Sequence, residues 1–343
     1  MSVVVVVSYR LGLSDGVSIE SAKWCWALRE LGHTVLTVAG EGDADVLVDG
    51  LALGSTAPPN TDALREAFMG ADWVIAENIC SLPINSRASA AVAEILQGRP
   101  AILHHHDLPW QRPGGDAGAV PTDREWRHVT INQLSLEQLR ARGIDAVEVP
   151  NHFDLDPVPG NRAAMRQAIG VRDSATLVVH PVRAIPRKNC SAALRLAERL
   201  GAIYWLVGDA EDGYDDALDR ILHFARTGVR QGAPEGFTMA DVYAAADIVV
   251  LSSTWEGFGN AAIESVAHRR PLARSRYPVM AEIERHGLRY FDLDAIEALE
   301  KFVERPDEEL LDENVAAARA AYDISLLPGR LESVLGIGDA ARQ

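Results

Sequence analysis

The sequence predicts an α/β protein with two doubly wound domains, and three observations support this fold class. Its 343 residues exceed the usual length of one domain. Short apolar runs alternate with segments of helical periodicity, as in strands and helices around parallel sheets. This alternation stops at residues 149–161, which carry three prolines, and then starts again. We therefore expect two Rossmann-like domains that face a central cleft, with the ligand bound in that cleft.

The first domain is expected to span residues 1–155. Its first strand is the valine run at residues 3–7, which is apolar on both faces like a strand buried on both sides. A helix over about residues 17–31 follows the Gly-bearing loop after this strand. The other candidate strands are residues 34–39, 72–76, 100–104, 128–132 and 145–149.

The second domain is expected to span residues 156–343. Its candidate strands are residues 176–181, 202–208, 246–253 and 270–275, and its candidate helices include residues 190–200 and a segment that begins near Asn260. The chain is helical in character from about residue 307 to 335. We expect the last helix of this stretch to pack back on the first domain.

Composition and charge exclude several classes of protein. Acidic residues outnumber Lys plus Arg by 49 to 33, which gives a formal charge of -16. Such a surface repels phosphate backbones and anionic lipids, so we expect no nucleic-acid partner and no stable membrane association. The three cysteines are widely spaced, and the short apolar N-terminal run has no basic leader. These features favour a cytoplasmic enzyme without a disulfide framework.

Residues 246–271 (ADIVVLSSTWEGFGNAAIESVAHRRP) are the most informative segment of the sequence. A strand leads into a loop with Glu256, Gly257 and Gly259, and a helix then carries Glu264. Carboxylates accept hydroxyl hydrogen bonds, while glycines and a helix N-terminus suit a phosphate. Two glutamates near a helix start are usually a capping or solvated pair. The position of the loop at the end of a strand favours a binding site for a phosphorylated, hydroxyl-rich ligand.

Residues 180–189 (HPVRAIPRKN) form a basic loop between another strand and helix. Arg183 and Lys188 would stabilise the charge of a departing diphosphate. A solvated basic turn is the simpler alternative, and Arg187 could replace either cation electrostatically. Lysine occurs only three times in the sequence, which favours a specific role for Lys188.

Two loops of the first half are further candidates. Gly12 and Gly16 lie between the first strand and the first helix, where backbone N–H groups can reach a diphosphate. This spacing differs from the dinucleotide-binding fingerprint and alone would be read as a turn. The second loop, in residues 102–115 (ILHHHDLPWQRPGG), follows a strand. Alternate strand side chains point to opposite faces, so its three histidines cannot easily bind one metal ion.

These segments together resemble the retaining GT-B glycosyltransferases, especially the family-4 group. Glu256 and Glu264 match the E-x7-E signature of that family, and Arg183 and Lys188 match its R-x4-K motif. The resemblance implies that Glu256 contacts donor-sugar hydroxyls and that Glu264 binds the nucleotide ribose. It further implies that the loop after Glu256 presents backbone amides to the sugar and diphosphate, through Gly257, Phe258, Gly259 and Asn260.

The same resemblance assigns roles in the first half of the chain. The loop with Gly12 and Gly16 is similar to the Gly-Gly-Val loop of the family, although Asp15 replaces the first of those glycines. A strand-end histidine followed by an acidic residue falls on His106 and Asp107. Beyond them, Trp110 could stack on a sugar and Arg112 could pair with an acidic acceptor. An anchoring role of Trp110 in a surface loop is an equal alternative.

The function that the resemblance implies is a retaining hexosyltransferase, metal-independent and without a cofactor. Its partners would be a nucleotide-sugar donor, UDP-glucose or GDP-mannose, and a small soluble acceptor such as a sugar, polyol or hydroxy acid. A nucleotide-sugar 2-epimerase and a non-catalytic nucleotide-sugar-binding protein are the alternatives. The R-x4-K and E-x7-E pairs count against both. A pyridoxal-phosphate-dependent phosphorylase is poorly supported, because the other two lysines lack a cofactor-loop context.

Overall fold

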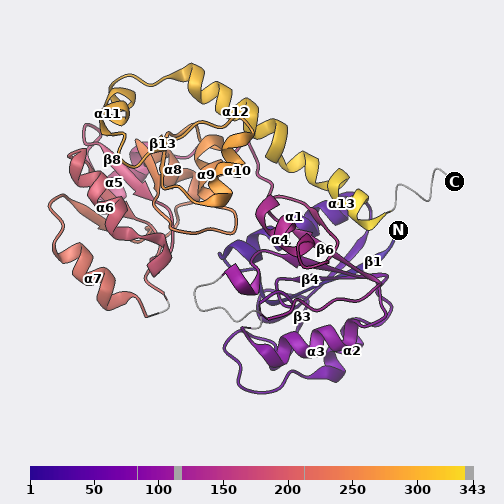
Figure 1. The fold of residues 1–343 in the computed structure, drawn as a ribbon. Helices are drawn as coiled ribbons and strands as arrows, with labels where there is room; N and C mark the ends of the chain where they lie inside the picture. The colour runs from indigo at the N-terminus through magenta and orange to yellow at the C-terminus, as the bar shows by residue number, and fades with distance from the viewer. Residues whose placement is uncertain (83, 112–117, 212, 337–343) are drawn as a thin grey trace. The chain divides into compact units, whose positions relative to one another are not determined.

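The computed structural model describes residues 1–82, 84–111, 118–211 and 213–336. These residues form two compact units, each built around a parallel sheet (Figure 1). Unit 1 contains Met1–His152 and the chain from Ile324 onward, and unit 2 contains Phe153–Asp323. The predicted fold class, two Rossmann-like α/β domains, is thereby confirmed. The division falls three residues before the expected boundary at 155/156.

The sheet of unit 1 has seven parallel strands in the order β3-β2-β1-β4-β5-β6-β7. Its strands are β1 (Val3–Leu11), β2 (Thr34–Gly42), β3 (Val46–Leu47), β4 (Trp73–Glu77), β5 (Ala101–His105), β6 (Trp126–Thr130) and β7 (Ala146–Glu148). Its helices are α1 (Gly16–Glu30), α2 (Thr61–Ala67), α3 (Ser86–Leu96), α4 (Gln133–Arg140) and α13 (Leu327–Leu335), with short 3-10 turns η1 (Pro109–Gln111) and η3 (Ile324–Leu326).

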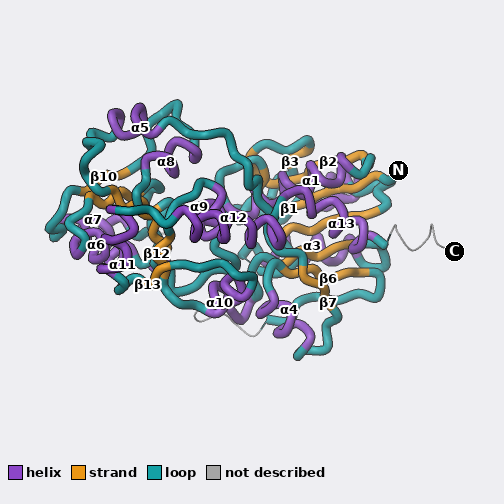
Figure 2. Tube along the Cα trace, turned by 90° about the horizontal axis from the view of Figure 1, so that it is seen from above, coloured by secondary structure: helices purple, strands orange, loops and turns teal. Residues whose placement is uncertain are grey.

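The valine run in β1 explains why this sheet is covered on both faces. Val5 and Val7 pack in one apolar cluster with α2 and α3, whereas Val4 and Val6 pack in the other with α1 and α13. Figure 1 shows α2 and α3 on one side of this sheet and α1 on the other, and Figure 2 shows its strands lying side by side. A strand with apolar residues on both faces therefore forms the middle of a three-layer unit.

Helix α13 returns the end of the chain to unit 1. Leu327, Leu331 and Leu335 lie in the same apolar cluster as Val4 and Trp24. Residues 324–336 thus belong to unit 1, whereas the expected second domain was drawn to the C-terminus. The physical reason is burial: the apolar face of α13 covers sheet surface beside α1, and this removes both surfaces from water.

The sheet of unit 2 has six parallel strands in the order β10-β9-β8-β11-β12-β13. Its strands are β8 (Leu177–His180), β9 (Ile203–Leu206), β10 (Val229–Gln231), β11 (Ile248–Leu251), β12 (Leu272–Arg274) and β13 (Phe291–Asp292). Its helices are α5 (Arg162–Ala168), α6 (Cys190–Arg199), α7 (Asp215–His223), α8 (Met239–Ala245), α9 (Asn260–Ala267), α10 (Pro278–Arg285), α11 (Ile296–Glu304) and α12 (Glu308–Tyr322), with the turn η2 (Pro186–Lys188).

The strand order of each sheet reverses at one point, between β1 and β4 in unit 1 and between β8 and β11 in unit 2. Ligands of doubly wound sheets bind outside the carboxyl ends of the strands at such a switch point. The loops after β1, β8 and β11 contain three of the four predicted segments. The fourth segment follows β5, which pairs with β4. The topology thus places the candidate residues where this fold binds ligands.

The short edge strands β3, β10 and β13 were not expected from the sequence. Each has only two or three residues, which is too few for a periodic pattern. Conversely, β1 continues beyond the valine run to Leu11, because its backbone pairs with β2 as far as Gly42. Across the described residues, no helix combines the length and apolar character needed to span a bilayer.

Candidate active site

Glu256 is the centre of the candidate site in unit 2. Its side chain lies in the loop after β11 and is buried, with 5% of the residue surface exposed. One carboxylate oxygen, Oε1, accepts hydrogen bonds from Nζ of Lys188 at 2.5 Å and from the hydroxyl of Ser253. The other, Oε2, accepts from Nη1 of Arg187 at 2.5 Å. Burial opposes ionisation, but the two cations outweigh it and hold the pKa of Glu256 below its ordinary value.

Lys188 is positioned by contacts between the loops after β8 and β11. The hydroxyl of Ser252 donates to the backbone carbonyls of Lys188 at 2.8 Å and Asn189 at 3.1 Å. The N–H of Thr254 donates to the carbonyl of Arg187 at 2.8 Å. Burial lowers the pKa of Lys188 despite the opposing effect of Glu256. The sequence therefore places a cation and a carboxylate from separate loops in direct contact.

Arg183 has a different partner. Its Nη1 donates to the carboxylate of Glu211 at 2.5 Å, and both side chains are more than one-third exposed. Exposed ion pairs contribute about 0–1 kcal/mol, so this contact holds the side chain weakly. Close by, a Cβ on Gly208 would lie 2.6 Å from the carbonyl oxygen of Val182, so the loop after β9 packs directly against this segment. The structure thus brings Lys188, and not Arg183, onto Glu256.

The glycine at the start of α9 is required by its surroundings. Gly259 has a φ of 100°, and a Cβ there would lie 2.3 Å from the hydroxyl of Tyr277. Asn260 is the first residue of α9, so its N–H belongs to the open end of that helix. The Tyr277 hydroxyl is buried and has no hydrogen-bond partner among the described residues. The close backbone approach in the loop of Glu256 therefore lies beside an unsatisfied hydroxyl from the residue that precedes α10.

The remaining predicted residues of this loop have more ordinary contacts. Phe258 is buried and packs against Phe153 and Tyr322, with ring centroids 5.9 Å and 5.6 Å away. The side chain of Phe258 therefore has a packing role. Its neighbour Gly257 lies in the loop, outside any helix or strand. Glu264, two turns into α9, accepts a hydrogen bond from the hydroxyl of Tyr243 at 2.6 Å.

The loop after β1 is shaped by Gly12 and Asp15. Gly12 has a φ of 70°, and a Cβ there would lie 2.6 Å from the Cβ of Asp43. Asp15 is the N-cap of α1: its carboxylate accepts the N–H groups of Val17 and Ser18. Asp15, which departs from the family pattern, thus accepts hydrogen bonds from N–H groups in the first turn of α1. A Cβ on Gly16 would meet open space.

The histidines at the end of β5 point to opposite faces, as strand geometry requires. His104 and His106 both contact Glu77, at the end of β4: its Oε2 lies 2.8 Å from Nδ1 of His104 and 2.9 Å from Nε2 of His106. All three side chains are buried. Burial favours the neutral acid, but the two histidines overcome this effect and lower the pKa of Glu77 to about 2. Glu77 is therefore an ionised carboxylate.

His105 belongs to a separate buried network on the other face. Its Nδ1 is 2.6 Å from the hydroxyl of Ser81, and its Nε2 is 2.9 Å from Nδ1 of His128. Burial lowers the pKa of His105 well below its ordinary value. These three residues form an internal hydrogen-bond chain that does not include His104 or His106.

The residues that follow His106 are held by polar contacts. The N–H of Asp107 donates to Oδ1 of Asn78 at 3.3 Å. The indole of Trp110 donates to Gln138 at 2.8 Å, and the guanidinium of Arg142 lies 3.7 Å from its ring centroid. One face of Trp110 is thus already covered by a cation. Arg112, the candidate partner of an acidic acceptor, lies outside the described residues.

Within the described part of the chain, one cluster has the donor atoms for a metal ion. The three atoms of Glu77, His104 and His106 lie within 4.8 Å of one another, and histidine with carboxylate suits Zn²⁺. In the structure these same atoms are joined by hydrogen bonds. The expected independence from metal therefore stays a prediction that metal analysis can test.

Three residues of the site were missed by sequence reasoning: Glu77, Ser253 and Tyr277. Glu77 ends a parallel strand beside the strand of the histidines, so its position at the sheet edge was the available signal. Ser253 is the second residue after β11 and was treated as part of the strand. Tyr277, the residue before α10, reaches the loop of Gly259, and nothing local in its sequence indicates this contact.

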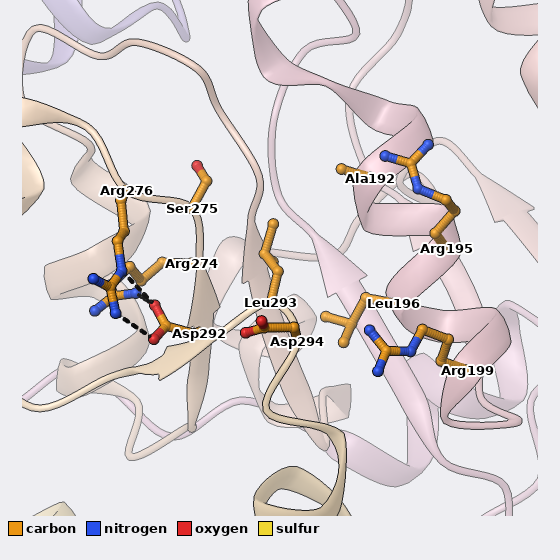
Figure 3. A pocket seen from close by; sticks show the side chains of 10 residues that line it. All are labelled: Ala192, Arg195, Leu196, Arg199, Arg274, Ser275, Arg276, Asp292, Leu293 and Asp294. Atoms are coloured by element: carbon orange, nitrogen blue, oxygen red, sulfur yellow. Dashed lines mark hydrogen bonds and ion pairs between the residues drawn. The ribbon is translucent and has the colours of Figure 1, made fainter.

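A cavity of about 500 Å³ in unit 2 contains none of the predicted site residues (Figure 3). It is bounded by α6 and by the residues that end β12 and β13. Figure 3 shows Arg276 bonded to both oxygens of Asp292, with Arg195 and Arg199 on α6 across from them. Asp292 also binds Arg274. Two of the four arginines on its walls, Arg274 and Arg276, thus already share Asp292 as a partner, and we assign the cavity no ligand.

His180, at the end of β8, should make stability depend on pH. Burial, with repulsion from Lys188, lowers its pKa to about 3, whereas an unfolded histidine titrates near 6.5. Between these values the unfolded state binds more protons, so stability falls as pH falls, by at most about 1.4 kcal/mol per unit. We expect thermal melts of the wild type to decline more steeply from pH 6.5 to 4.5 than those of His180→Gln. Equal slopes would contradict this assignment.

The family comparison concerns unit 2. Residues 175–308 match the model of the family described as Glycosyl transferases group 1. This range contains the loops of Lys188 and Glu256. A D-inositol 3-phosphate glycosyltransferase of Mycobacteroides abscessus is 32% identical over 39% of this chain and 33% of that protein.

Two relatives extend the similarity over most of the chain. The mannosylglucosylglycerate synthase of Thermotoga maritima is 24% identical over an alignment that covers 98% of this chain and 95% of that protein. The enzyme of the same name from Petrotoga mobilis is also 24% identical, covering 80% of this chain and 82% of that protein.

Solved structures show the same fold. Anabaena HepE, in a complex with UDP and glucose, has a TM-score of 0.75 at 17% identity and covers 98% of this chain and 100% of that one. Sucrose-phosphate synthase of Thermosynechococcus elongatus has a TM-score of 0.76 at 14% identity, covering 99% and 100%. The fold is thus the GT-B fold, and the similarity to these relatives supports a glycosyltransferase. Residues 175–308, in unit 2, are similar to the group 1 glycosyltransferases.

Proposed function

We propose that the protein transfers a hexose from a nucleoside diphosphate sugar to a hydroxyl of a small acceptor and retains the anomeric configuration. The observation that carries this proposal is the contact of the buried Glu256 with Lys188 and Arg187, at the switch point of unit 2. A carboxylate accepts sugar hydroxyls, and the adjacent cations stabilise a departing diphosphate. Both are required for transfer from such a donor.

In the proposed mechanism, the acceptor hydroxyl attacks on the same face from which the diphosphate departs. The bond between the anomeric carbon and the diphosphate oxygen breaks, and the acceptor oxygen bonds to that carbon. The departing oxygen takes the proton of the acceptor hydroxyl, so atoms and charges balance. Lys188 stabilises the diphosphate, while Glu256 orients the sugar ring. Arg183, freed from its weak contact with Glu211, joins Lys188 on the diphosphate, and Glu264 binds the ribose.

The acceptor is proposed to bind to unit 1 and to be a hydroxy acid or its glycoside. The names of the two long relatives, mannosylglucosylglycerate synthases, support a glycoside of glycerate as the acceptor and mannose as the sugar. The complex of HepE with UDP-glucose supports glucose as the alternative sugar. GDP-mannose and UDP-glucose are therefore the two donors to test. The proposal includes a cytoplasmic location and no metal requirement.

Transfer can be tested with purified protein, each donor, and glucosylglycerate, glycerate or glucose as acceptor. We expect one donor to yield a product larger by one hexose in mass spectrometry, with one nucleoside diphosphate released per transfer. NMR should show an α-linked product, and EDTA should leave the rate unchanged. A β-linked product would overturn retention, while loss of activity in EDTA would overturn metal independence. Conversion of the donor to its 2-epimer without an acceptor would support the epimerase instead.

A further inference from the structure

The cluster around Glu77 is held by specific hydrogen bonds, which packing of two strand-end histidines alone would not require. One oxygen of the carboxylate, Oε2, receives both histidine contacts, at 2.8 Å from Nδ1 of His104 and 2.9 Å from Nε2 of His106. Glu77 and His104 have no exposed surface, and His106 is 6% exposed. A carboxylate only accepts hydrogen bonds, so each of these two ring nitrogens carries a proton.

This contact makes the two nitrogens of His106 unequal. Nε2 is committed to Glu77, so a neutral ring leaves Nδ1 without a proton. Nδ1 makes no hydrogen bond among the described residues. It is nevertheless not one of the fully buried polar atoms that lack a partner. Nδ1 is therefore part of the small exposed surface of His106. The solvent-exposed nitrogen of His106 is thus the one that can accept a hydrogen bond.

Further contacts hold the ring and the carboxylate in place. Trp24 of α1 stacks on His104 with ring centroids 4.0 Å apart, and His104 in turn lies 4.4 Å from the ring of His106. Oδ1 of Asn78 accepts the backbone N–H of His106 at 3.1 Å, and Asn78 takes a φ of 56° to do so. A residue in this uncommon backbone region needs support from its surroundings. The chain thus fixes both the backbone and the side chain of His106.

We propose that Glu77 is a positioning residue that holds His106 in the Nε2–H tautomer, so that Nδ1 accepts the hydrogen bond of a substrate hydroxyl. This inference rests on the proposed function, because it assigns the substrate contact to His106. The role of Glu77 is to act through His106, and His104 supports Glu77 with the second hydrogen bond. Ionisation of Glu77 is consistent with this role, since its pKa is lowered to about 2.

The first test is spectroscopic and does not need activity. Nitrogen-15 NMR of histidine-labelled protein at alkaline pH should show His106, identified by its loss in His106→Asn, with the proton on Nε2 alone. In Glu77→Gln, which keeps the shape but loses the charge, His106 should shift to a mixture of tautomers. A proton on Nδ1 in the wild type would overturn the proposal. So would one bound metal ion per chain in the purified protein.

The second test is kinetic. We expect Glu77→Gln to lower kcat by about 10²-fold with little change in the KM of the donor, since the effect of a wrong tautomer falls on the reacting state. The double variant Glu77→Gln/His106→Asn should be no slower than His106→Asn, because both changes remove one function. Independent, multiplicative losses would overturn the proposal. Ser81→Ala, which breaks the His105 network on the opposite face, is the matched control and should keep the wild-type kcat.

The two tests separate failure of this inference from failure of the proposed function. If no donor is turned over by the wild type, the proposed function fails, while the NMR experiment still decides the tautomer of His106. If transfer occurs but Glu77→Gln keeps the wild-type kcat, the proposed function stands and the role of Glu77 is refuted.

Discussion

Replacing Lys188 by methionine should lower kcat for glycosyl transfer by about 10³-fold, the scale at which single electrostatic stabilisers act in enzymes. Lys188 lies against Glu256 with its ammonium 2.5 Å from the carboxylate and with 13% of its side chain exposed. Methionine keeps the unbranched apolar stem but removes the charge that would face the departing diphosphate. The measurement is nucleoside diphosphate release at saturating donor and acceptor.

The fold should survive this substitution. Glu256 keeps two hydrogen-bond partners, Arg187 and Ser253, so its carboxylate is not left without compensation. Circular dichroism of Lys188→Met should therefore match the wild type. Lys301→Met is the matched control, because Lys301 is exposed on α11 and lies outside the site. A loss of less than tenfold in Lys188→Met would reduce this ion pair to a structural contact.

The double mutant Arg183→Met/Lys188→Met would show whether the two cations act together. Arg183 pairs with Glu211 in the structure, so a shared role requires its side chain to move when the donor binds. If it does, the double variant should lose less than the product of the single losses, because both changes act on one diphosphate.

The main strands and the residues at their ends could be predicted because they depend on local pattern. The valine run of β1 and the apolar runs of β8 and β11 are unambiguous, and Glu256 and Lys188 lie in the loops after two of these strands. Parallel strands bring their carboxyl ends to one edge of a sheet. Two loops that lie 68 residues apart in sequence are therefore in contact.

What the sequence could not predict depends on long-range packing and on side-chain conformation. The last helix was expected to pack on the first domain, but the local pattern of α13 does not indicate which strands it covers. Arg183 and Arg187 are both cations in one loop, and their positions alone do not decide which reaches Glu256. Glu77 is a single carboxylate without a motif. Glu77 contacts His106 only because β4 pairs with β5, a pairing that the local sequence does not indicate.

Asp247 shows how unit 2 supports its site, and its substitution should cause a large loss of stability. It lies just before β11, and its carboxylate binds Arg162 and Arg166, both at 2.5 Å, and the N–H of Leu177 at 2.8 Å. Arg166 is 1% exposed. These bonds tie α5 to the first residues of both β8 and β11, the strands on either side of the switch point.

The change Asp247→Asn should therefore destabilise unit 2 by about 3–5 kcal/mol, because it leaves the guanidinium of Arg166 buried without its counter-ion. For a unit of this size, the melting temperature should fall by roughly 6–20 °C. Asp312→Asn is the matched control: Asp312 binds Arg269 in an exposed pair, worth about 0–1 kcal/mol. Calorimetry of the full chain measures both variants. Equal small shifts would show that the backbone carbonyls around Arg166 suffice to compensate its charge, and that β8 and β11 do not depend on Asp247 for their alignment.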